Sequence, residues 1–366
     1  MPVTMTHRQR LLAALAGQPT DVMPWFADLT YWRHARQLDG TLSTEYEGEE
    51  GLVRLHADLG VGYYLGYATA HVEVLDDVRV SAATEGNVTL TRWATPVGDI
   101  VAETTFLPRS ASGAVTQWPV TRPADLRVLR YIAEATHYKP AYEDYERHNE
   151  LAGDQGHPTV LPPRSPLSQM LAQWAGVEGL TFLLADARAA VEAVLAALAR
   201  AADSAYDAIC RCATPYVELG DNLTGEVVTH LFERYQFDYY VQRAEQLHAA
   251  GKLMGTHLDG TMRGILPVLA RTGLDFVESI TPAPCGDVRV DRVRELAGAD
   301  LVLFGGIPGA MFAAPFGPDD VRRQVELVVR HHWPNGKWIL GSADQVPPHG
   351  DISLVRLIGE WVRQLC

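Results

Sequence analysis

The chain has 366 residues, 47% of them hydrophobic, a composition typical of a soluble globular protein. Its formal net charge of −14 argues against nucleic-acid binding and against docking on an anionic membrane, both of which require a basic surface. It contains no apolar run of about 18 residues that would span a membrane.

The N-terminal segment predicts a short helix rather than a signal peptide. Thr6 and Gln9 have the spacing of a capping box, which predicts that a helix begins there. Leu11 and Leu15 lie on one face of this helix, and Gly17 follows as a stop signal. The apolar run is too short and too interrupted for export, so we expect a cytoplasmic protein.

Residues 60–67, "GVGYYLGY", read as a strand, and the segment after them has a different pattern. Residues 71–108 alternate polar and apolar side chains around an "EGN" turn. This alternation predicts an antiparallel β-ribbon rather than a strand–helix–strand unit. We interpret the ribbon as an insertion.

From about residue 155 onward, short apolar strands alternate with amphipathic helices, which is the pattern of a parallel sheet. The expected helices cover residues 186–209, 230–251 and 319–333. The expected strands cover residues 159–166, 214–222, 253–260, 275–282, 301–308 and 337–348. The sequence thus predicts an α/β fold, a (β/α)8 TIM barrel with an inserted antiparallel β-ribbon, in a single domain over residues 1–366.

Cysteines and paired histidines give little sign of a metal site on their own. Four cysteines are too few for a disulfide framework in a chain of this length. Cys210 and Cys212 lack the two-residue spacer of common zinc or redox pairs, so we interpret them as packing at a helix end, and Cys366 as a free thiol. His331 and His332 close a helix, where the helix dipole favours them.

In such barrels the chemistry takes place at the carboxyl ends of the strands, so the residues there are the candidate site. They are Asp28, Tyr31, Trp32, Glu218, Asp221, Asn222, His257, Asp259, Glu278, Ser279, Gly305, Gly306, Ser342, Asp344 and Gln345.

Several of these residues allow two interpretations. His257 and Asp259 either flank a metal ion or are a hydrogen-bonded barrel residue and the start of a turn. Glu218 points either into the barrel or outward, and Cys285, seven residues after Glu278, is either a ligand or a tolerated small residue.

The same ambiguity holds for the remaining residues at the strand ends. Asp221 and Asn222 either contact substrate or form an Asx turn. Tyr31 and Trp32, together with Trp25 and Phe26, form either an aromatic wall for a planar methyl donor or core packing. The "FGGIP" segment (304–308) lacks the lysine of a Walker motif, so we expect its glycines to let the backbone approach a large ligand or partner.

Five stretches together are similar to the uroporphyrinogen decarboxylase superfamily: "RQRLLAALAGQPTDVMPWF", "TPVGDI", "HLDGTMRGILPVLARTGLDFVESITPAPCGD", "LVLFGGIP" and "ILGSADQVPP". The resemblance implies a (β/α)8 barrel. It also implies one of three chemistries: cofactor-free porphyrinogen decarboxylation, zinc-dependent methyl transfer with corrinoid proteins, or cobalamin-independent methionine synthesis.

The decarboxylase branch carries an arginine-rich segment after the first strand that holds substrate carboxylates. This chain has "FADLTYWRH" there, with Arg33 as the clear cation, and acids crowd the predicted site. A substrate with many carboxylates would be costly to bury in such a site. Decarboxylation, with Asp28 or Asp221 steering protonation, therefore remains an alternative, as does a non-catalytic barrel that binds corrinoid or a partner.

The resemblance to the zinc methyltransferases implies the ligands. His257 matches the histidine of their His-x-Cys motif, Asp259 occupies the cysteine position, and Glu278 matches the glutamate ligand of the methionine synthases. Ser342 and Asp344 lie where the last cysteine would fall. The implied metal ligands are thus His257, Glu278 and Asp259, with Cys285, Glu218 and Asp344 as further candidates.

Other roles follow from the same resemblance. The expected catalytic residues are Asp221, Asn222 and Asp344; the expected substrate-binding residues are Asp28, Tyr31, Trp32, Glu218 and Ser342; and the expected corrinoid contacts are Gly305 and Gly306.

Oxygen ligands in place of thiolates leave zinc a stronger Lewis acid, suited to polarising the leaving oxygen of a methoxy group. We therefore expect a zinc-dependent methyltransferase that moves a methyl group from a methylated, in particular a methoxylated, small molecule to cob(I)alamin. The chain has no corrinoid-binding segment, so the cobalamin is expected on a separate corrinoid protein. A homodimer is compatible with the sequence.

Overall fold

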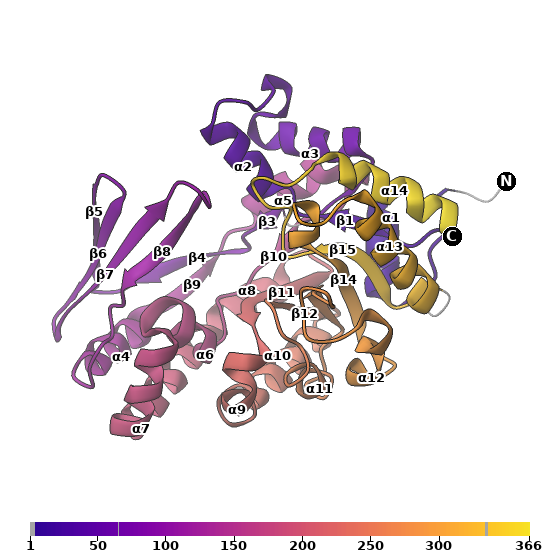
Figure 1. Ribbon diagram of the computed structural model, residues 1–366. Helices are drawn as coiled ribbons and strands as arrows, with labels where there is room; N and C mark the ends of the chain where they lie inside the picture. The colour runs from indigo at the N-terminus through magenta and orange to yellow at the C-terminus, as the bar shows by residue number, and fades with distance from the viewer. Residues whose placement is uncertain (1–3, 65, 334–335) are drawn as a thin grey trace.

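The computed structural model describes residues 4–64, 66–333 and 336–366, and its centre is a nine-stranded parallel sheet (Figure 1). The strands lie in the order β2-β1-β15-β14-β13-β12-β11-β10-β3. Their bounds are β1 (Trp25–Ala27), β2 (Gly62–Tyr63), β3 (Tyr67–Ala68), β10 (Thr159–Val160), β11 (Tyr216–Leu223), β12 (Leu253–Leu258), β13 (Phe276–Ile280), β14 (Val302–Pro308) and β15 (Trp338–Ala343).

The sheet closes on itself as a barrel. Its two end strands, β2 and β3, come from one stretch of chain, and the last strand of the sequence, β15, pairs in parallel with the first, β1. A further bridge between Tyr63 and Gly156 spans the seam. When β2 and β3 are counted as one interrupted strand, the barrel has the eight strands that the sequence predicts.

Helices cover the outside of the barrel (Figure 1). Thr6 caps the first helix through the predicted capping box with Gln9. None of the helices in the described part of the chain is long and apolar enough to cross a membrane. The helices of eight or more residues are α1 (His7–Leu15), α2 (Thr30–Leu38), α3 (Gly48–Leu59), α4 (Asp125–Ala135), α5 (Glu143–Ala152), α7 (Gly176–Ala201), α8 (Asp203–Arg211), α9 (Gly225–Tyr235), α10 (Phe237–Ala249), α13 (Pro318–His332) and α14 (Ser353–Leu365). The short ones are α6 (Pro166–Gln169), α11 (Leu266–Leu269) and α12 (Val293–Ala297).

The inserted antiparallel structure exists, but its bounds differ from the predicted 71–108. The four-stranded sheet consists of β5 (Arg79–Glu85), β6 (Val88–Thr95), β7 (Gly98–Leu107) and β8 (Ser112–Gln117). The predicted start, β4 (His71–Leu75), instead pairs with β9 (Thr136–Pro140) in a separate sheet. Local alternation shows that a segment is a strand, but not which later strand it pairs with.

Three other predicted elements are shorter or divided. Only residues 159–160 of the predicted strand 159–166 pair, because Pro162 and Pro163, which follow, have no N–H to donate. The predicted helix 186–209 is α7, kinked at Ala187, followed by α8. The predicted helix 230–251 is α9 and α10, divided at Gln236, whose backbone is not helical. The helix of 319–333 is confirmed as α13.

Aromatic side chains fill the interior of the barrel beneath the carboxyl ends of the strands. Phe26, Tyr64, Tyr216, Phe276 and Phe304 form one buried cluster, and leucines of α1 pack against it. Side chains along a strand alternate between its two faces, so an aromatic residue and the residue two positions later point to the same side. Phe26, Tyr216 and Phe276 are each followed two positions later by an acid, so the aromatic cluster is the floor of an acidic site.

Candidate metal centre

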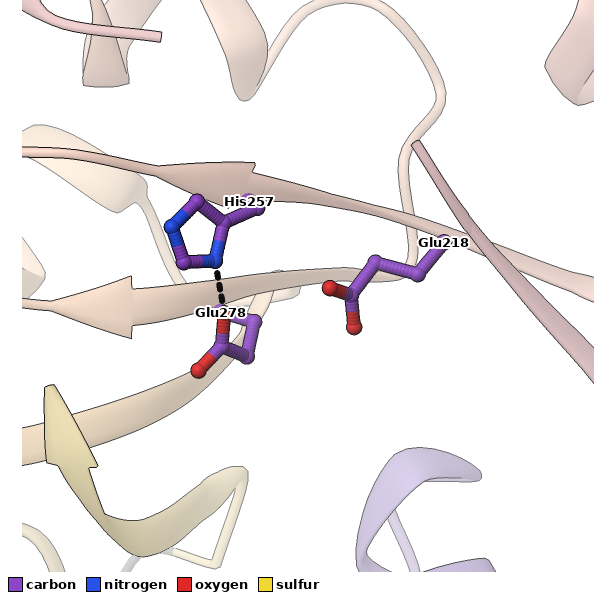
Figure 2. A group of neighbouring side chains, drawn as sticks. All are labelled: Glu218, His257 and Glu278. Atoms are coloured by element: carbon purple, nitrogen blue, oxygen red, sulfur yellow. Dashed lines mark hydrogen bonds and ion pairs between the residues drawn. The ribbon is translucent and has the colours of Figure 1, made fainter. Parts of the chain in front are cut away.

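Three neighbouring strands bring Glu218, His257 and Glu278 together (Figure 2). Each of these side chains offers one ligand atom, and the three atoms lie within 4.8 Å of one another. His257 on β12 is directly opposite Glu278 on β13, and Glu218 on β11 is opposite Gly255, two residues before His257. All three side chains are buried, with exposed fractions of 0%, 6% and 1% for Glu218, His257 and Glu278.

Gly255 makes room for the floor of this group. A Cβ at this position would lie 2.1 Å from the ring of Phe276, which is the residue opposite it on β13. That distance is far below any real contact, so only glycine lets the aromatic ring lie level with Glu218. The same packing fixes the position of β13 along the barrel axis. It therefore also fixes the level at which Glu278, two positions after Phe276, projects toward His257.

Hydrogen bonds orient two of the three side chains. His257 Nδ1 lies 2.5 Å from Glu278 Oε2. Figure 2 marks this contact with a dashed line. The Tyr64 hydroxyl donates to Glu218 Oε2. Within the described part of the chain, Glu218 Oε1 is buried without a hydrogen-bond partner. An unpaired carboxylate oxygen in the protein interior is costly, which indicates that something else satisfies it.

The electrostatics of the group favour a bound cation. Burial, followed by the charge of Glu278, raises the pKa of Glu218 to about 8, and burial raises that of Glu278 as well. Burial by itself would lower the pKa of His257, but the charges and hydrogen bond of the neighbouring glutamates outweigh it and raise this pKa to about 9. Two carboxylates thus share one imidazole, and a divalent cation would stabilise their charged forms. One nitrogen and two oxygen donors are a ligand set that zinc accepts.

Asp259, the third ligand implied by the resemblance, lies outside this group. Its side chain is exposed, and Asn222 donates to its Oδ2 over 3.4 Å. Asn222 in turn accepts from Arg164 over 3.1 Å, so the three residues form a polar row across the ends of β10, β11 and β12. Glu218, which the resemblance gave as a further candidate, is the third member of the convergent group. Cys285 is exposed and is also not part of the group.

Asp221, predicted to be catalytic, is held in a buried hydrogen-bond network. Its carboxylate accepts from the backbone N–H of Ser165, from Gln236 Nε2 and from the Tyr240 hydroxyl, at 2.9, 2.9 and 2.7 Å. Tyr240 also lies 3.0 Å from Thr256 Oγ1 on β12. These contacts tie the end of β11 to its neighbours, which is a positioning role; a catalytic role stays a prediction.

Four further predicted residues form two hydrogen-bonded pairs where β1, β13 and β15 end. The Asp28 N–H donates to Ser342 Oγ, and the Asp344 N–H donates to Ser279 Oγ, at 3.2 and 2.7 Å. Burial raises the pKa of Asp28 to about 7, and the charges of Asp344 and Glu278 contribute. Asn222, Ser279 and Asp344 all have positive φ angles, a backbone strain that is common around functional sites.

The aromatic wall is only partly assembled. Phe26 belongs to the barrel floor, and the Trp25 indole donates to the backbone of Val355. Trp32 is half-buried and donates to Gly350 O, while Tyr31 is half-buried near the end of β1.

Packing explains the two glycines predicted to contact the corrinoid. A Cβ on Gly305 would meet the backbone of Ile280 at 2.5 Å, and one on Gly306 would meet Val328 at 3.1 Å. The close approach is therefore to the neighbouring strand and to α13, and a contact with corrinoid stays a prediction.

Sequence reasoning missed two tyrosines. Tyr64 is fully buried and bonded to Glu218. Tyr67 is half-exposed, and desolvation together with the charges of Glu218, Asp28, Glu278 and Asp344 raises its pKa. The signal was the repeated tyrosine in the segment 60–67, which lies at a strand end.

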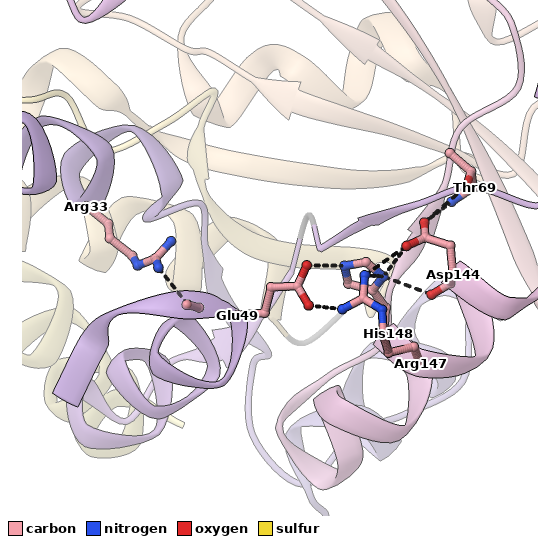
Figure 3. Close-up of polar contacts among 7 residues, drawn as sticks. Arg33, Glu49, Thr69, Asp144, Arg147 and His148 are labelled. Carbon is pink, nitrogen blue, oxygen red and sulfur yellow. Dashed lines mark hydrogen bonds and ion pairs between the residues drawn. The ribbon is translucent and has the colours of Figure 1, made fainter. Parts of the chain in front are cut away.

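A polar cluster holds the chain just after Tyr67 (Figure 3). Asp144 on α5 accepts from the N–H and hydroxyl of Thr69, at 2.8 and 3.1 Å. Arg147, also on α5, pairs with both Asp144 and Glu49 on α3. The cluster joins the end of β3 to two outer helices, and so it supports the rim on which Tyr67 lies.

Comparison with known proteins supports the fold and identifies the family. A solved structure, a methyltransferase from Methanosarcina mazei, superimposes with a TM-score of 0.61 at 13% sequence identity, covering 98% of this chain and 99% of that one. No curated protein matches the sequence. The family model described as uroporphyrinogen decarboxylase (URO-D) matches residues 115–365. The chain therefore belongs to the uroporphyrinogen decarboxylase family.

Proposed function

We propose that this protein is a zinc-dependent methyltransferase that moves a methyl group from a methoxylated small molecule to cob(I)alamin on a separate corrinoid protein. The observation that carries the proposal is the buried group of Glu218, His257 and Glu278 at the carboxyl ends of the barrel strands. Family membership and the fold shared with a methyltransferase support it.

Glu218, His257 and Glu278 would hold the metal, because they are buried and convergent and leave Glu218 Oε1 unsatisfied. Bound zinc would supply Lewis-acid polarisation of the leaving oxygen of the methyl donor. Glu278 orients the His257 ring through Nδ1, and Tyr64 fixes one oxygen of Glu218. Such supporting hydrogen bonds hold metal ligands in place and tune them.

The transfer breaks the bond between the methyl carbon and oxygen, and the electron pair of that bond stays on oxygen. Cob(I)alamin provides the electron pair of the new bond to the methyl carbon, and the leaving oxygen then needs a proton. Asp28, a buried acid with a pKa of about 7, is our candidate for delivering it. The partner would dock over the carboxyl ends of the strands.

Metal analysis and a methyl-transfer assay test the proposal. Purified protein should contain about one zinc per chain. The double variant His257→Ala, Glu278→Ala should lose both the metal and methyl transfer, whereas the control His248→Ala, on an exposed histidine that pairs with Asp275, should keep both. A metal-free preparation with full activity would contradict the proposal.

A second function, cofactor-free decarboxylation of a porphyrinogen, is favoured by one observation. A decarboxylase needs a buried acid to protonate the carbanion, and Asp28 meets that requirement. The neighbouring acids make decarboxylation the less favoured function, because they would repel a substrate that carries many carboxylates. Decarboxylation that persists in chelator and is lost in Asp28→Asn would favour this function over methyl transfer.

A further inference from the structure

Strand β5, at the edge of the inserted sheet, is an open edge. The sheet projects from the barrel, and its order β5-β6-β7-β8 leaves β5 paired on one side only (Figure 1). All seven residues of β5, Arg79–Glu85, are exposed. Natural edge strands are usually protected by charged side chains, proline or a bulge. The charged residues of β5 lie only at its two ends, and the strand has no proline and no register shift, whereas the ladder of the opposite edge strand, β8, carries a register shift.

The register of the β5–β6 hairpin shows which backbone groups of β5 are unpaired. Glu85 is opposite Val88, so the loop has two residues, and the pair that closes such a loop exchanges hydrogen bonds. Hydrogen bonding then alternates along the strand. Odd-numbered residues of β5 bond to β6, and the N–H and C=O groups of Val80, Ala82 and Thr84 point to the open edge.

The sequence of β5, Arg-Val-Ser-Ala-Ala-Thr-Glu, is complementary to itself when it runs antiparallel. A two-fold axis at Ala82 places Ala82 opposite its own copy, Val80 opposite Thr84, and Arg79 opposite Glu85. The three outward-facing residues then meet as hydrogen-bonded pairs, which is the arrangement that the register requires. Small side chains at the centre of the strand let a second backbone approach.

The charges at the two ends of β5 are available for this pairing. Neither Arg79 nor Glu85 forms an ion pair with another residue in the described ranges. Both residues are odd-numbered and lie on the same face of the strand, so an Arg79 would project beside the Glu85 of the second copy. This pair would fall at a non-hydrogen-bonded position, where side chains are closest across a ladder. Cross-strand pairs of opposite charge stabilise such ladders, and like charges destabilise them.

We propose that β5 is a homodimerisation edge: two copies of this chain pair antiparallel through β5 about a two-fold axis at Ala82, joining two four-stranded sheets into one. The paired strands alone form a small interface, so we expect a dimer that dissociates on dilution. The proposal does not depend on the metal centre.

Sedimentation velocity of the full-length protein over a range of concentrations tests the proposal. The wild type should shift from monomer to dimer as concentration rises. Arg79→Glu alone places two acids opposite each other, and Glu85→Arg alone places two arginines opposite each other, so each should raise the dimer dissociation constant about 10-fold. The double variant Arg79→Glu, Glu85→Arg restores opposite charges and should return to the wild-type constant.

Two further variants separate this edge from other surfaces. Arg109→Glu makes the same charge change on the inserted sheet but outside β5 and should leave dimerisation unchanged. Ala82→Pro removes an outward-pointing N–H, so it should abolish the dimer while circular dichroism remains that of the folded chain. A wild type that is monomeric at every concentration, a folded Ala82→Pro variant that still dimerises, or a double charge variant that remains weakened would each overturn the proposal.

Discussion

Glu218 and Asp259 are two of the acids that the sequence offers for the third ligand position. Glu218 is buried beside His257 and Glu278, whereas Asp259 is exposed and contacts Asn222. We predict that Glu218→Gln weakens zinc binding at least about 10-fold, because a neutral amide replaces a charged ligand. Asp259→Asn, with the same change of one oxygen to nitrogen, should bind zinc as the wild type does. Chelator competition measures both constants, and equal losses in the two variants would exclude this assignment.

Tyr64 is predicted to act on the metal through Glu218. Replacing it with phenylalanine removes the donor to Glu218 Oε2 and leaves a buried carboxylate less well oriented. Loss of such a supporting bond typically costs 10–100-fold in metal affinity, so Tyr64→Phe should lower zinc affinity by about 10-fold or more. Tyr216→Phe is the matched control, because the Tyr216 hydroxyl contacts Thr159 and the His157 carbonyl instead. Unchanged affinity in Tyr64→Phe would show that Glu218 is positioned by other contacts.

The residues differ in how much of their role the sequence could predict. His257 and Glu278 lie near the carboxyl ends of short apolar strands, and the family resemblance matched both. The direction in which the Glu218 side chain points can be predicted only when the strand register is known. Because Gly255 lies opposite Glu218, Glu218 points to the same face of the sheet as His257. Tyr64 could not be assigned, because it lies just after β2 and its hydroxyl reaches Glu218 on β11, which is distant in the sequence.

Strands β11 and β13 each carry an aromatic residue and, two positions later, an acid. In each strand the aromatic residue belongs to the aromatic cluster in the barrel, and the acid belongs to the candidate metal centre. The fit at β12 depends on Gly255, where a Cβ would overlap the Phe276 ring. We predict that Gly255→Ala lowers the free energy of unfolding by about 1–3 kcal/mol, the usual range for overpacking. Gly220→Ala, on β11 with only ordinary contacts around its Cβ, should change it much less. Urea unfolding compares the two, and similar values would refute the packing argument.

Helix α13 carries a pH-dependent contribution to stability at its C-terminal end. Burial lowers the pKa of His332 to about 4, while His332 Nε2 bonds to Val290 O and the ring stacks on Trp338. Because this pKa lies below the value of about 6.5 in the unfolded chain, the unfolded state binds more protons between about pH 4 and 6.5. Protonation therefore favours unfolding as the pH falls through that window.

The corresponding prediction compares two proteins at two pH values. On going from about pH 7 to pH 5, the stability difference between wild type and His332→Asn should shrink by about 2 kcal/mol at most. Urea unfolding of both proteins at each pH measures it. A difference that does not change with pH would show that His332 titrates normally.

At the level of elements, the sequence predicts whether a segment is a strand or a helix better than it predicts which strands pair with each other. The alternation in residues 71–108 correctly indicated antiparallel strands, yet β4 pairs with β9, more than sixty positions later in the chain. Non-local pairing of this kind leaves no local pattern. The helix break at Gln236 was missed for a similar reason: its side chain reaches Asp221 on a neighbouring strand, a contact made only in the folded chain.

For the whole molecule, the alternating strand and helix pattern was sufficient to predict the barrel, because parallel strands with helical crossovers close in few ways. The position of the site follows from the same topology, since chemistry in these barrels lies at the carboxyl ends of the strands. Recognition of the proposed methyl donor and docking partner would depend on surfaces that form only after folding. Their identities therefore remain part of the proposed function.

If Glu218, His257 and Glu278 together hold one metal ion, crystals of the zinc-loaded protein will show where it binds. Anomalous diffraction recorded on both sides of the zinc absorption edge should give a strong peak between these three side chains, with Asp259 outside ligand distance. A zinc peak at another group of residues, with His257 and Glu278 still bonded only to each other, would contradict this assignment.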